Sequence, residues 1–480
     1  MCRKITLLLL FFVPVLSQAQ TLVSSTKLGT RTRSELLTEF QVPFIQYGVD
    51  YYRLVYTTTN TQGLPDTVSG LVVVPDDPTR IYPRLVYQHG TAGSTMDVPS
   101  FNVNADGEGI IGWLFGGLGY VALLPDYLGL GVSDGFHPYV HAASEAQTGV
   151  DILRAFNEFA LQNGVYANDQ LFITGYSQGG HAAMALHREI ELTLADTFTV
   201  TAAAHLSGPY SMSGVMRNLF ISDEVYPAPG YVPYTVLSYQ TAYGNIFNQV
   251  EDVFKAAYAP AIGQFFNNQI SLNQLNDLLS AALVANEGSV RPVRMFQDSL
   301  LQNVVNQPNH PFNRALADND TYAWAPEAPT RVFYCMADDQ VPFENGVLAV
   351  DTMLALGAQQ TQGLDVNPAA DHGDCVLPAL TQTFFFFLPY QQIGTVGTSA
   401  PWVAGKLDIW PNPVSEEMVV RDLPSDGLLR VMDLSGKTVL EQAVSAGNQR
   451  IQMGSVPEGL YLLCFTAEGR VWYEKVVVRR

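Results

Sequence analysis

Residues 170–180 read Gln-Leu-Phe-Ile-Thr-Gly-Tyr-Ser-Gln-Gly-Gly, and they decide the fold of this chain. The apolar run 171–174 predicts a short buried strand, and the residues after Gly180 predict a helix. Between them, residues 175–179 have the pattern G-x-S-x-G, which in this context forms a sharp turn that exposes the Ser177 hydroxyl. The turn needs glycine because the strand and helix approach too closely for a Cβ. A glycine-rich turn without chemistry is the alternative.

Strands and helices are expected to alternate around this turn. The further expected strands are residues 51–58, 67–75, 84–88, 120–124, 198–205 and 330–334. Residues 145–162 predict a helix, because apolar side chains recur every three to four positions. This alternation predicts an α/β fold with a mostly parallel sheet covered on both faces, and the first two strands fit an antiparallel start.

The interval between His205 and Thr330 does not follow this alternation. A structureless loop of that length is rare in a compact domain. Residues 271–285 and 290–305 each predict a helix with one apolar face, and tyrosine and phenylalanine crowd the first half of the interval. We therefore expect a helical cap inserted at about 208–328. Its aromatic residues are expected to form the core of the cap, with lining of an apolar substrate pocket as the alternative.

Both ends of the chain differ from this central domain. Residues 1–19 have the basic start, short apolar stretch and small residues of a signal peptide, and are too short for a membrane anchor. No later segment is expected to cross a membrane. Residues 389–404 read as a linker after a catalytic domain over 20–388. Short alternating runs between turns predict a small all-β sandwich over 405–480.

Composition narrows the possible functions. The 480-residue chain is 47% hydrophobic, so it can bury large cores. A formal net charge of −20 argues against nucleic-acid binding, which needs a basic surface. No phosphate loop, dinucleotide fingerprint or cluster with metal-ligand spacing is present in the sequence, so neither a cofactor nor a metal is expected.

Ser177 needs a base within hydrogen-bond reach, and the base needs a carboxylate that fixes its tautomer. In hydrolases with this turn the acid and then the histidine follow the serine along the chain. Of the eight histidines only His372 lies beyond the expected acid loop, which follows the strand 330–334. We favour Asp338 as the acid over Asp339, and Asp371 is a weaker rival. Solvated loops are the alternative for all of these positions.

An oxyanion formed at Ser177 would need backbone donors. One is expected to be the N–H of Gln178, and the other the N–H of Thr91, in the turn 89–93 after an early strand. A glycine turn without a role is the alternative. Asp126 precedes Ser177 and is expected only to hold its loop by hydrogen bonds.

Two cysteines flank the expected acid and base. Cys335 lies three residues before Asp338, and Cys375 three residues after His372. If the two loops meet, the thiols come close. A disulfide and a pair of buried free thiols both remain open.

Together these motifs resemble the secretory lipase family, a branch of the α/β-hydrolases, over about residues 45–388. The residues that carry the resemblance are His89-Gly90-Thr91, residues 125–131 with His137-Pro138-Tyr139, residues 175–180, residues 338–342 and His372-Gly373. The resemblance implies ester hydrolysis through an acyl-enzyme, with Ser177 as nucleophile, Asp338 as acid and His372 as base. Residues 335–337 depart from it, because a His-Gly pair is frequent there in these hydrolases.

The C-terminal region resembles a type IX secretion sorting domain. The similar segments are residues 409–413, 433–437, 458–461 and 475–480. This implies export through the periplasm and across the outer membrane, to the cell surface or beyond, with the secretion machinery as a partner of residues 405–480. A carbohydrate- or surface-binding module is the alternative.

These patterns favour an exported serine esterase or lipase that acts on a small-molecule or lipid ester. A serine peptidase or acyl-peptide hydrolase would use the same three residues. A binding or adhesion protein without catalysis is a third hypothesis, which nothing in the motif set supports.

Overall fold

The computed structural model describes residues 21–103, 107–396, 402–433, 437–467 and 470–480. The expected signal peptide, residues 1–19, lies outside this part of the chain. The chain divides into two compact units, Met1–Gly394 and Thr395–Arg480.

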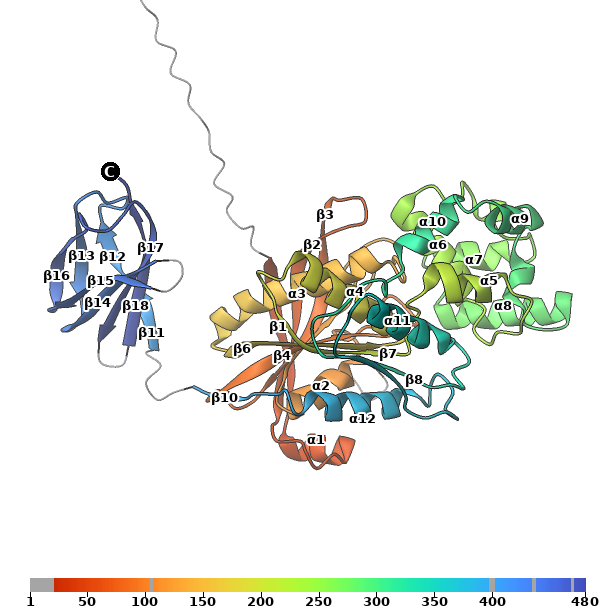
Figure 1. Cartoon of the computed structure of the whole chain (residues 1–480), viewed down its shortest axis with the longest axis horizontal. Coiled ribbons are helices and arrows are strands. Elements are labelled where there is room, and N and C mark those ends of the chain that lie inside the picture. The colour runs from red at the N-terminus through yellow and green to blue at the C-terminus, as the bar shows by residue number, and fades with distance from the viewer. Residues whose placement is uncertain (1–20, 104–106, 397–401, 434–436, 468–469) are drawn as a thin grey trace, which may run out of the picture. The chain divides into compact units, whose positions relative to one another are not determined.

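The larger unit is built on a ten-stranded sheet (Figure 1). Its path is β1-β2-β3-β5-β4-β6-β7-β8-β9, and β10 pairs with β4. From β5 onward along this path the strands are parallel, whereas β1, β2, β3 and β5 pair antiparallel. The mostly parallel sheet with an antiparallel start is therefore confirmed. The strands are β1 (Leu22–Arg31), β2 (Val49–Thr59), β3 (Pro65–Pro75), β4 (Arg80–Gln88), β5 (Val121–Pro125), β6 (Ala167–Tyr176), β7 (Val200–Leu206), β8 (Thr330–Tyr334), β9 (Thr361–Asp365) and β10 (Gly394–Thr395).

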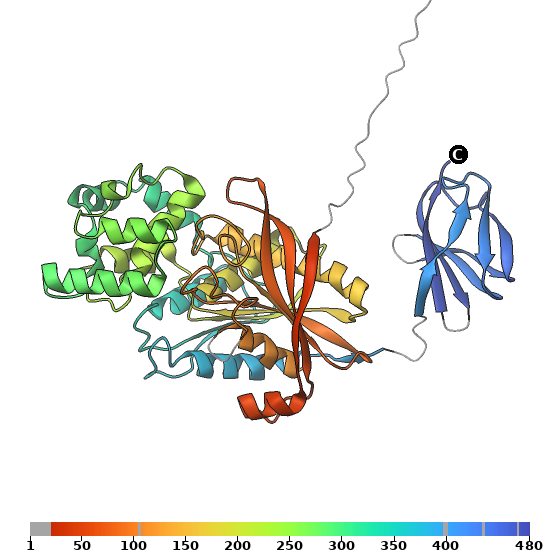
Figure 2. The same ribbon diagram turned by 180° about the vertical axis from the view of Figure 1, so that it is seen from behind.

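Helices cover both faces of this sheet (Figures 1 and 2). Alternate strand residues point to opposite faces, so Val72 and Val86 join one buried cluster while Leu71 and Leu85 join another. Helices α3 (Ala142–Asn163) and α4 (Gln178–Thr193) pack on the first cluster. The second cluster includes side chains of α1 (Arg33–Phe40), α2 (Gly109–Gly117) and α12 (Val376–Phe387). Helix α11 (Glu344–Ala355) connects β8 to β9.

The residues between β7 and β8 form the expected helical cap, drawn in green in Figure 1. The cap has its own apolar core, in which Tyr234, Tyr239, Phe254 and Phe265 are buried. The aromatic residues thus form the core of the cap. Its elements are η1 (Met212–Met216), α5 (Arg217–Ile221), α6 (Tyr231–Tyr243), η2 (Val250–Asp252), α7 (Ala259–Phe266), α8 (Leu272–Glu287), η3 (Pro292–Met295), α9 (Asp298–Asn306) and α10 (Pro311–Asp318).

The prediction of a single helix over 290–305 is wrong. The chain forms the short 3₁₀ helix η3, an extended residue, and then α9. Phe296 has φ −76° and ψ 150° and forms a β-bridge with Phe254, and the next N–H, that of Gln297, donates to the Val253 carbonyl at 2.8 Å. Pairing with this neighbouring segment overrides the helical periodicity of the apolar residues.

The smaller unit is the expected all-β sandwich. A five-stranded sheet, β11-β18-β17-β14-β15, and a three-stranded sheet, β12-β13-β16, enclose one apolar core. Val420 and Ile451 of the smaller sheet and Leu429, Leu463 and Phe465 of the larger are buried in it. The strands are β11 (Trp402–Lys406), β12 (Asp408–Trp410), β13 (Glu417–Leu423), β14 (Gly427–Met432), β15 (Thr438–Val444), β16 (Gly447–Gln452), β17 (Gly459–Ala467) and β18 (Arg470–Val478).

The segment expected as a linker over 389–404 starts as part of the larger unit. The Gln170 amide donates to the Tyr390 carbonyl at 2.7 Å, and the Gln391 amide donates to the Leu118 carbonyl at 2.9 Å. Strand β10 then pairs with β4. These bonds and the pairing of β10 bind residues 390–395 to the larger unit.

Candidate active site

Ser177 lies at the sharp turn between β6 and α4. Its backbone adopts φ 59° and ψ −122°, an uncommon conformation for a residue with a side chain. A Cβ on Gly179 would collide with the Gln88 carbonyl oxygen, and one on Gly175 would collide with the Gly179 carbonyl oxygen. The glycines are therefore required because β4, β6 and α4 approach closely here.

The structure brings Ser177, His372 and Asp338 together. Ser177 Oγ lies 2.9 Å from His372 Nε2. His372 Nδ1 lies 2.9 Å from Asp338 Oδ1 and 2.8 Å from Oδ2. A carboxylate only accepts, so Nδ1 carries the proton and Nε2 is free to accept the Ser177 hydroxyl proton.

The acid and base loops are fixed to each other. Asp338 follows β8, and its Oδ1 accepts the N–H groups of Gln340 and Val341 at 3.0 and 2.8 Å. His372 lies between β9 and α12, and its N–H donates to Asp339 Oδ1 at 3.2 Å. The hydroxyl of Tyr176, the residue before Ser177, donates to the His372 carbonyl at 2.5 Å.

Cys335 and Cys375 form a disulfide with a Cα–Cα distance of 6.1 Å. Of the two alternatives that the sequence left open, a disulfide and a pair of free thiols, the structure has the disulfide. Both residues are fully buried, in the cluster beneath α12. The bond joins the acid loop to the loop that carries His372.

The rival carboxylates have other partners. Asp371 Oδ1 accepts the Asp374 N–H at 2.9 Å rather than contacting the imidazole. Asp126 accepts hydrogen bonds from the hydroxyls of Ser69 and Ser100, at 2.6 and 2.5 Å, and holds its loop as expected. Burial raises the pKa of Asp126.

The turn that carries Thr91 lies against the turn that carries Ser177. Gln88 pairs with Gly175, and a Cβ on Gly90 would lie 3.4 Å from the Tyr176 carbonyl oxygen. Within the described residues, the backbone N–H groups of Thr91 and Gln178 donate no hydrogen bond. Unpaired amides can stabilise a developing negative oxygen, so both N–H groups are candidates for that role.

A pocket of about 160 Å³ lies beside this turn, between the sheet domain and the cap. Tyr234 and Phe265 of the cap line it, so part of the aromatic core of the cap also faces the pocket. The remaining lining residues are Ala92, Gly93, Ser94, Thr95, Gly129, Leu130, Phe136, His137, Asn268, Gln269, Ile270, Ser271 and Gln274. None of these side chains is a carboxylate, lysine or arginine, so the pocket suits a neutral ligand.

Metal-binding clusters and membrane-spanning helices are both absent from the described part of the chain. Its His, Cys, Asp and Glu side chains nowhere form a group of three that could hold a metal ion. None of its helices combines the length and the apolar character needed to span a bilayer.

Several solved structures are similar to the larger unit. A rice cell wall degrading esterase, LipA from Xanthomonas oryzae, superposes with a TM-score of 0.68 at 28% identity, over 78% of this chain and 99% of that one. A putative hydrolase from Legionella pneumophila gives 0.70 at 25% identity, over 77% and 98%. Candida antarctica lipase A gives 0.59 at 18% identity, over 77% and 81%, and shares the fold. No curated protein sequence matches.

These likenesses define the larger unit as a hydrolase of the esterase and lipase kind, in line with the resemblance to secretory lipases. Residues 408–479 match the secretion system C-terminal sorting domain. The protein is therefore a type IX export substrate, destined for the cell surface or for secretion.

A set of buried polar residues behind this site carries no motif in the sequence. Glu145, His137 and His181 are almost fully buried and are linked by hydrogen bonds through Gln178 and Glu145. Glu108 contacts the turn before Thr91. A glutamate in an amphipathic helix normally faces water, so sequence alone gave no signal for Glu145.

Proposed function

We propose that this protein is an exported serine hydrolase that cleaves carboxylic esters, with Ser177 as nucleophile, His372 as general base and Asp338 as the residue that orients it. The hydrogen-bonded chain Ser177–His372–Asp338 carries this proposal. The three side chains come from separate loops, and their order along the chain is the one that this class of hydrolase uses.

In the proposed reaction, His372 Nε2 takes the Ser177 hydroxyl proton while Oγ attacks the ester carbonyl carbon. The N–H groups of Gln178 and Thr91 stabilise the resulting oxyanion. The tetrahedral intermediate collapses, the alkoxy group leaves with the proton from His372, and an acyl-enzyme remains. Water, deprotonated by His372, then attacks the acyl carbon and releases the acid and Ser177.

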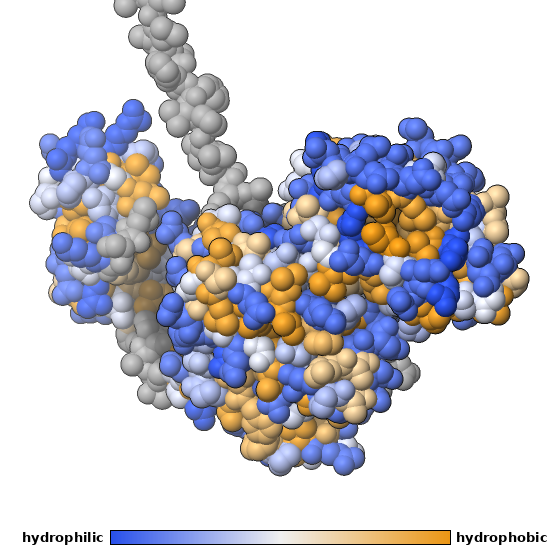
Figure 3. Space-filling view, turned by 45° about the vertical axis from the view of Figure 1, so that its right-hand side comes forward, coloured by the Kyte–Doolittle hydropathy of each residue, from blue (hydrophilic) through white to orange (hydrophobic). Residues whose placement is uncertain are grey.

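The pocket that begins at Ala92, next to Thr91, supports an uncharged ester as the substrate, although Ser177 and His372 do not line it. The pocket beside Thr91 combines aromatic faces with neutral hydroxyl and amide groups. Figure 3 shows an apolar area framed by hydrophilic residues on the side of the molecule that carries the cap. Esters of lipids and esters carried by plant cell wall polymers are both candidate substrates, the second by likeness to the Xanthomonas enzyme.

A panel of p-nitrophenyl esters from acetate to palmitate, together with aminoacyl anilides, tests the reaction class. We expect ester turnover in the wild type, loss of turnover in Ser177→Ala, and unchanged circular dichroism in that variant. Turnover of anilides without turnover of esters would contradict the proposal and identify a peptidase. The chain-length profile then separates an esterase from a lipase.

Export supplies the second part of the proposal. We infer that residues 1–19 direct the chain to the periplasm and that residues 405–480 are recognised by the type IX machinery. The sorting-domain match over 408–479 supports the second step. Deletion of 405–480 in the native host is expected to trap active enzyme in the periplasm; its release to the medium would contradict this assignment.

A further inference from the structure

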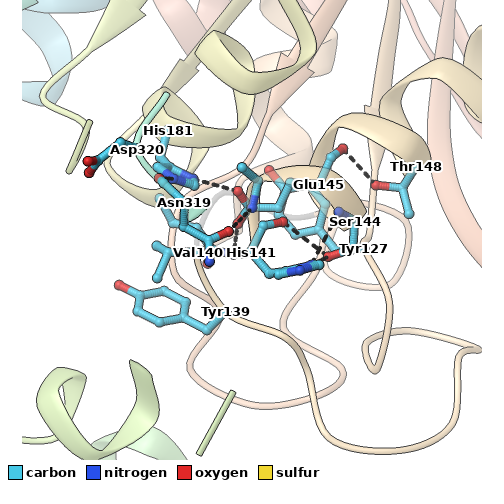
Figure 4. A network of polar contacts seen from close by, with 12 residues as sticks. Tyr127, Tyr139, Val140, His141, Ser144, Glu145, Thr148, His181, Asn319 and Asp320 are labelled. Carbon is cyan, nitrogen blue, oxygen red and sulfur yellow. Dashed lines mark hydrogen bonds and ion pairs between the residues drawn. The ribbon is translucent and has the colours of Figure 1, made fainter. Parts of the chain in front are cut away.

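Two glutamates contact the residues next to the two proposed oxyanion donors, the N–H groups of Gln178 and Thr91. Glu145 is on α3 and contacts the side chain of Gln178, whereas Glu108 precedes α2 and contacts the backbone of Gly90. Figure 4 shows the network around Glu145. Neither glutamate has a role in the proton transfers proposed above.

Glu145 is 1% exposed and has both oxygens bonded. Gln178 Nε2 donates to Oε1 at 2.8 Å, and His181 Nδ1 lies 2.7 Å from Oε2. His181 Nε2 faces the Asn319 carbonyl at 2.9 Å, so it must carry a proton. One further proton is shared by Nδ1 and Oε2, and the Glu145–His181 pair is electrically neutral as a whole.

The second hydrogen of the Gln178 amide is also fixed. Gln178 Nε2 lies 2.8 Å from His137 Nε2, and His137 Nδ1–H donates to the Leu128 carbonyl at 2.7 Å. Burial lowers the pKa of His137 to about 4, so at neutral pH its Nε2 is an acceptor. Both amide hydrogens of Gln178 are therefore bonded, which fixes the first residue of α4.

Glu108 fixes the turn that carries the other proposed donor, Thr91. Its two carboxylate oxygens accept the Gly90 N–H at 2.9 and 3.0 Å, and Oε2 also accepts the Tyr87 hydroxyl at 2.8 Å. Burial raises the pKa of Tyr87, so this hydroxyl remains a donor. Gly90 directly precedes Thr91, so Glu108 fixes the peptide just before the one that carries the Thr91 N–H. The carbonyl oxygen of the Thr91 peptide, that of Gly90, lies 2.7 Å from His89 Nδ1, which fixes the other end of the same residue.

We propose that Glu145 and Glu108 are positioning residues of the oxyanion hole: Glu145 acts through the side chain of Gln178 and Glu108 through the N–H of Gly90, and together they keep the Gln178 and Thr91 N–H groups in the orientation that the transition state needs. This inference rests on the proposed function. It predicts an effect on the tetrahedral species rather than on substrate binding, because the two amides act on charge that develops during the reaction.

The test compares full-length Glu145→Leu, Glu145→Gln and Glu108→Ala with the wild type. In Glu145→Leu and Glu108→Ala we expect kcat to fall by about 10- to 100-fold, short of the 10²–10³ for removal of a donor itself. KM should change less than about threefold, as for an interaction made only in the transition state. The inhibition constant of phenylboronic acid, whose adduct with Ser177 is tetrahedral, should rise in parallel with the loss of kcat.

The conservative variant separates positioning from charge. The carboxamide introduced by Glu145→Gln can accept from Gln178 and donate to the unprotonated Nδ1 of His181, so this variant should regain most of the lost kcat. Asp151→Leu is the matched control, since Asp151 is a buried acid on the same helix, bonded to Thr58 and Arg154. Asp151→Leu should lower the stability of the protein. Its kcat should stay within about twofold of the wild type, because Asp151 does not act through the oxyanion hole.

A double-mutant cycle with Gln178→Leu tests the route of the effect. If Glu145 acts through Gln178, the double variant should be no slower than the slower single variant, whereas independent effects would multiply. If Glu145→Leu does not fold, Gln178→Leu is compared with His137→Leu. Gln178→Leu removes the bonds to both Glu145 and His137, whereas His137→Leu removes only the second, so a larger loss of kcat in Gln178→Leu supports the role of Glu145 and an equal loss overturns it.

Folded variants with unchanged kcat, or with KM raised as strongly as kcat is lowered, would overturn the inference. The proposed function would be untouched by that result, since it depends on ester turnover by the wild type and on its loss in Ser177→Ala.

Discussion

Two neighbouring carboxylates, Asp338 and Asp339, have different tasks at the site. Asp338 accepts from the His372 imidazole, and Asp339 accepts from the His372 backbone N–H. The first interaction strengthens when the ring becomes positively charged, whereas the second only holds the loop. An amide can replace a carboxylate in the second role but not in the first.

We therefore expect Asp338→Asn to lower kcat by about 10⁴, the effect of losing the orienting acid in a related triad. Asp339→Asn should lower it by less than about tenfold, because its Oδ1 can still accept a hydrogen bond. Steady-state kinetics on one p-nitrophenyl ester measures both. The reverse order would show that the wrong carboxylate had been assigned.

At the residue scale, chain order alone restricts the choice of the base. His372 is the only histidine beyond the acid loop, and the structure places it 2.9 Å from Ser177. Glu145 and Glu108 could not be found in the same way. Their roles depend on which side chains from distant segments surround them, and neither lies in a motif.

At the scale of elements, the disulfide joins the loops that end β8 and begin α12. It closes a segment of 40 residues, and loop-closure entropy of that size corresponds to about 2–4 kcal/mol of folding stability. It also limits how far Asp338 and His372 can separate.

We expect the double variant Cys335→Ala, Cys375→Ala to unfold at a lower denaturant concentration than the wild type. Its kcat should fall by a larger factor than its KM rises. Denaturation curves and ester kinetics measure the two effects, and Cys464→Ala is the control for removal of a thiol elsewhere. Unchanged kcat in a destabilised variant would mean that the hydrogen bonds alone align the loops.

The helix prediction over 290–305 failed because backbone pairing with another segment replaces helical hydrogen bonds there. Apolar spacing predicts one helix over 290–305, but Phe296 pairs with Phe254 and splits it. The nucleophile turn was predictable because glycine, strand and helix all signal it locally. Pairing between distant segments leaves no comparable local signal.

At the scale of the whole molecule, buried histidines couple stability to pH. Burial lowers the pKa of His137 and of His141 to about 4, below the value of about 6.5 in an unfolded chain. Between these values the unfolded state binds more protons than the folded state. Stability is thus full above about pH 6.5 and falls as the pH drops toward 4.

The free energy of unfolding should therefore decrease steadily from pH 7 to pH 5, by an amount on the order of 1 kcal/mol or more per histidine. Urea denaturation at several pH values measures the slope. His141→Asn should reduce it, since asparagine can still cap α3 but does not titrate. An equal slope in this variant would assign the pH dependence to other groups.

The two compact units predict independent folding. A chain that ends at residue 396 keeps β10 and the whole sheet domain, whereas one that ends at residue 388 loses the bonds of Tyr390 and Gln391. We expect the chain that ends at residue 396 to match the full-length enzyme in melting temperature and kcat. The chain that ends at residue 388 should melt several degrees lower. Equal melting of both would show that residues 389–396 add no stability.

The cross-link beside the active site also bears on when the enzyme becomes competent. Thiols stay reduced in the cytosol and pair only in an oxidising compartment such as the periplasm. The newly made chain therefore forms the Cys335–Cys375 disulfide only after it leaves the cytosol. On the proposed function, oxidation after export therefore completes the alignment of the loops that carry Asp338 and His372.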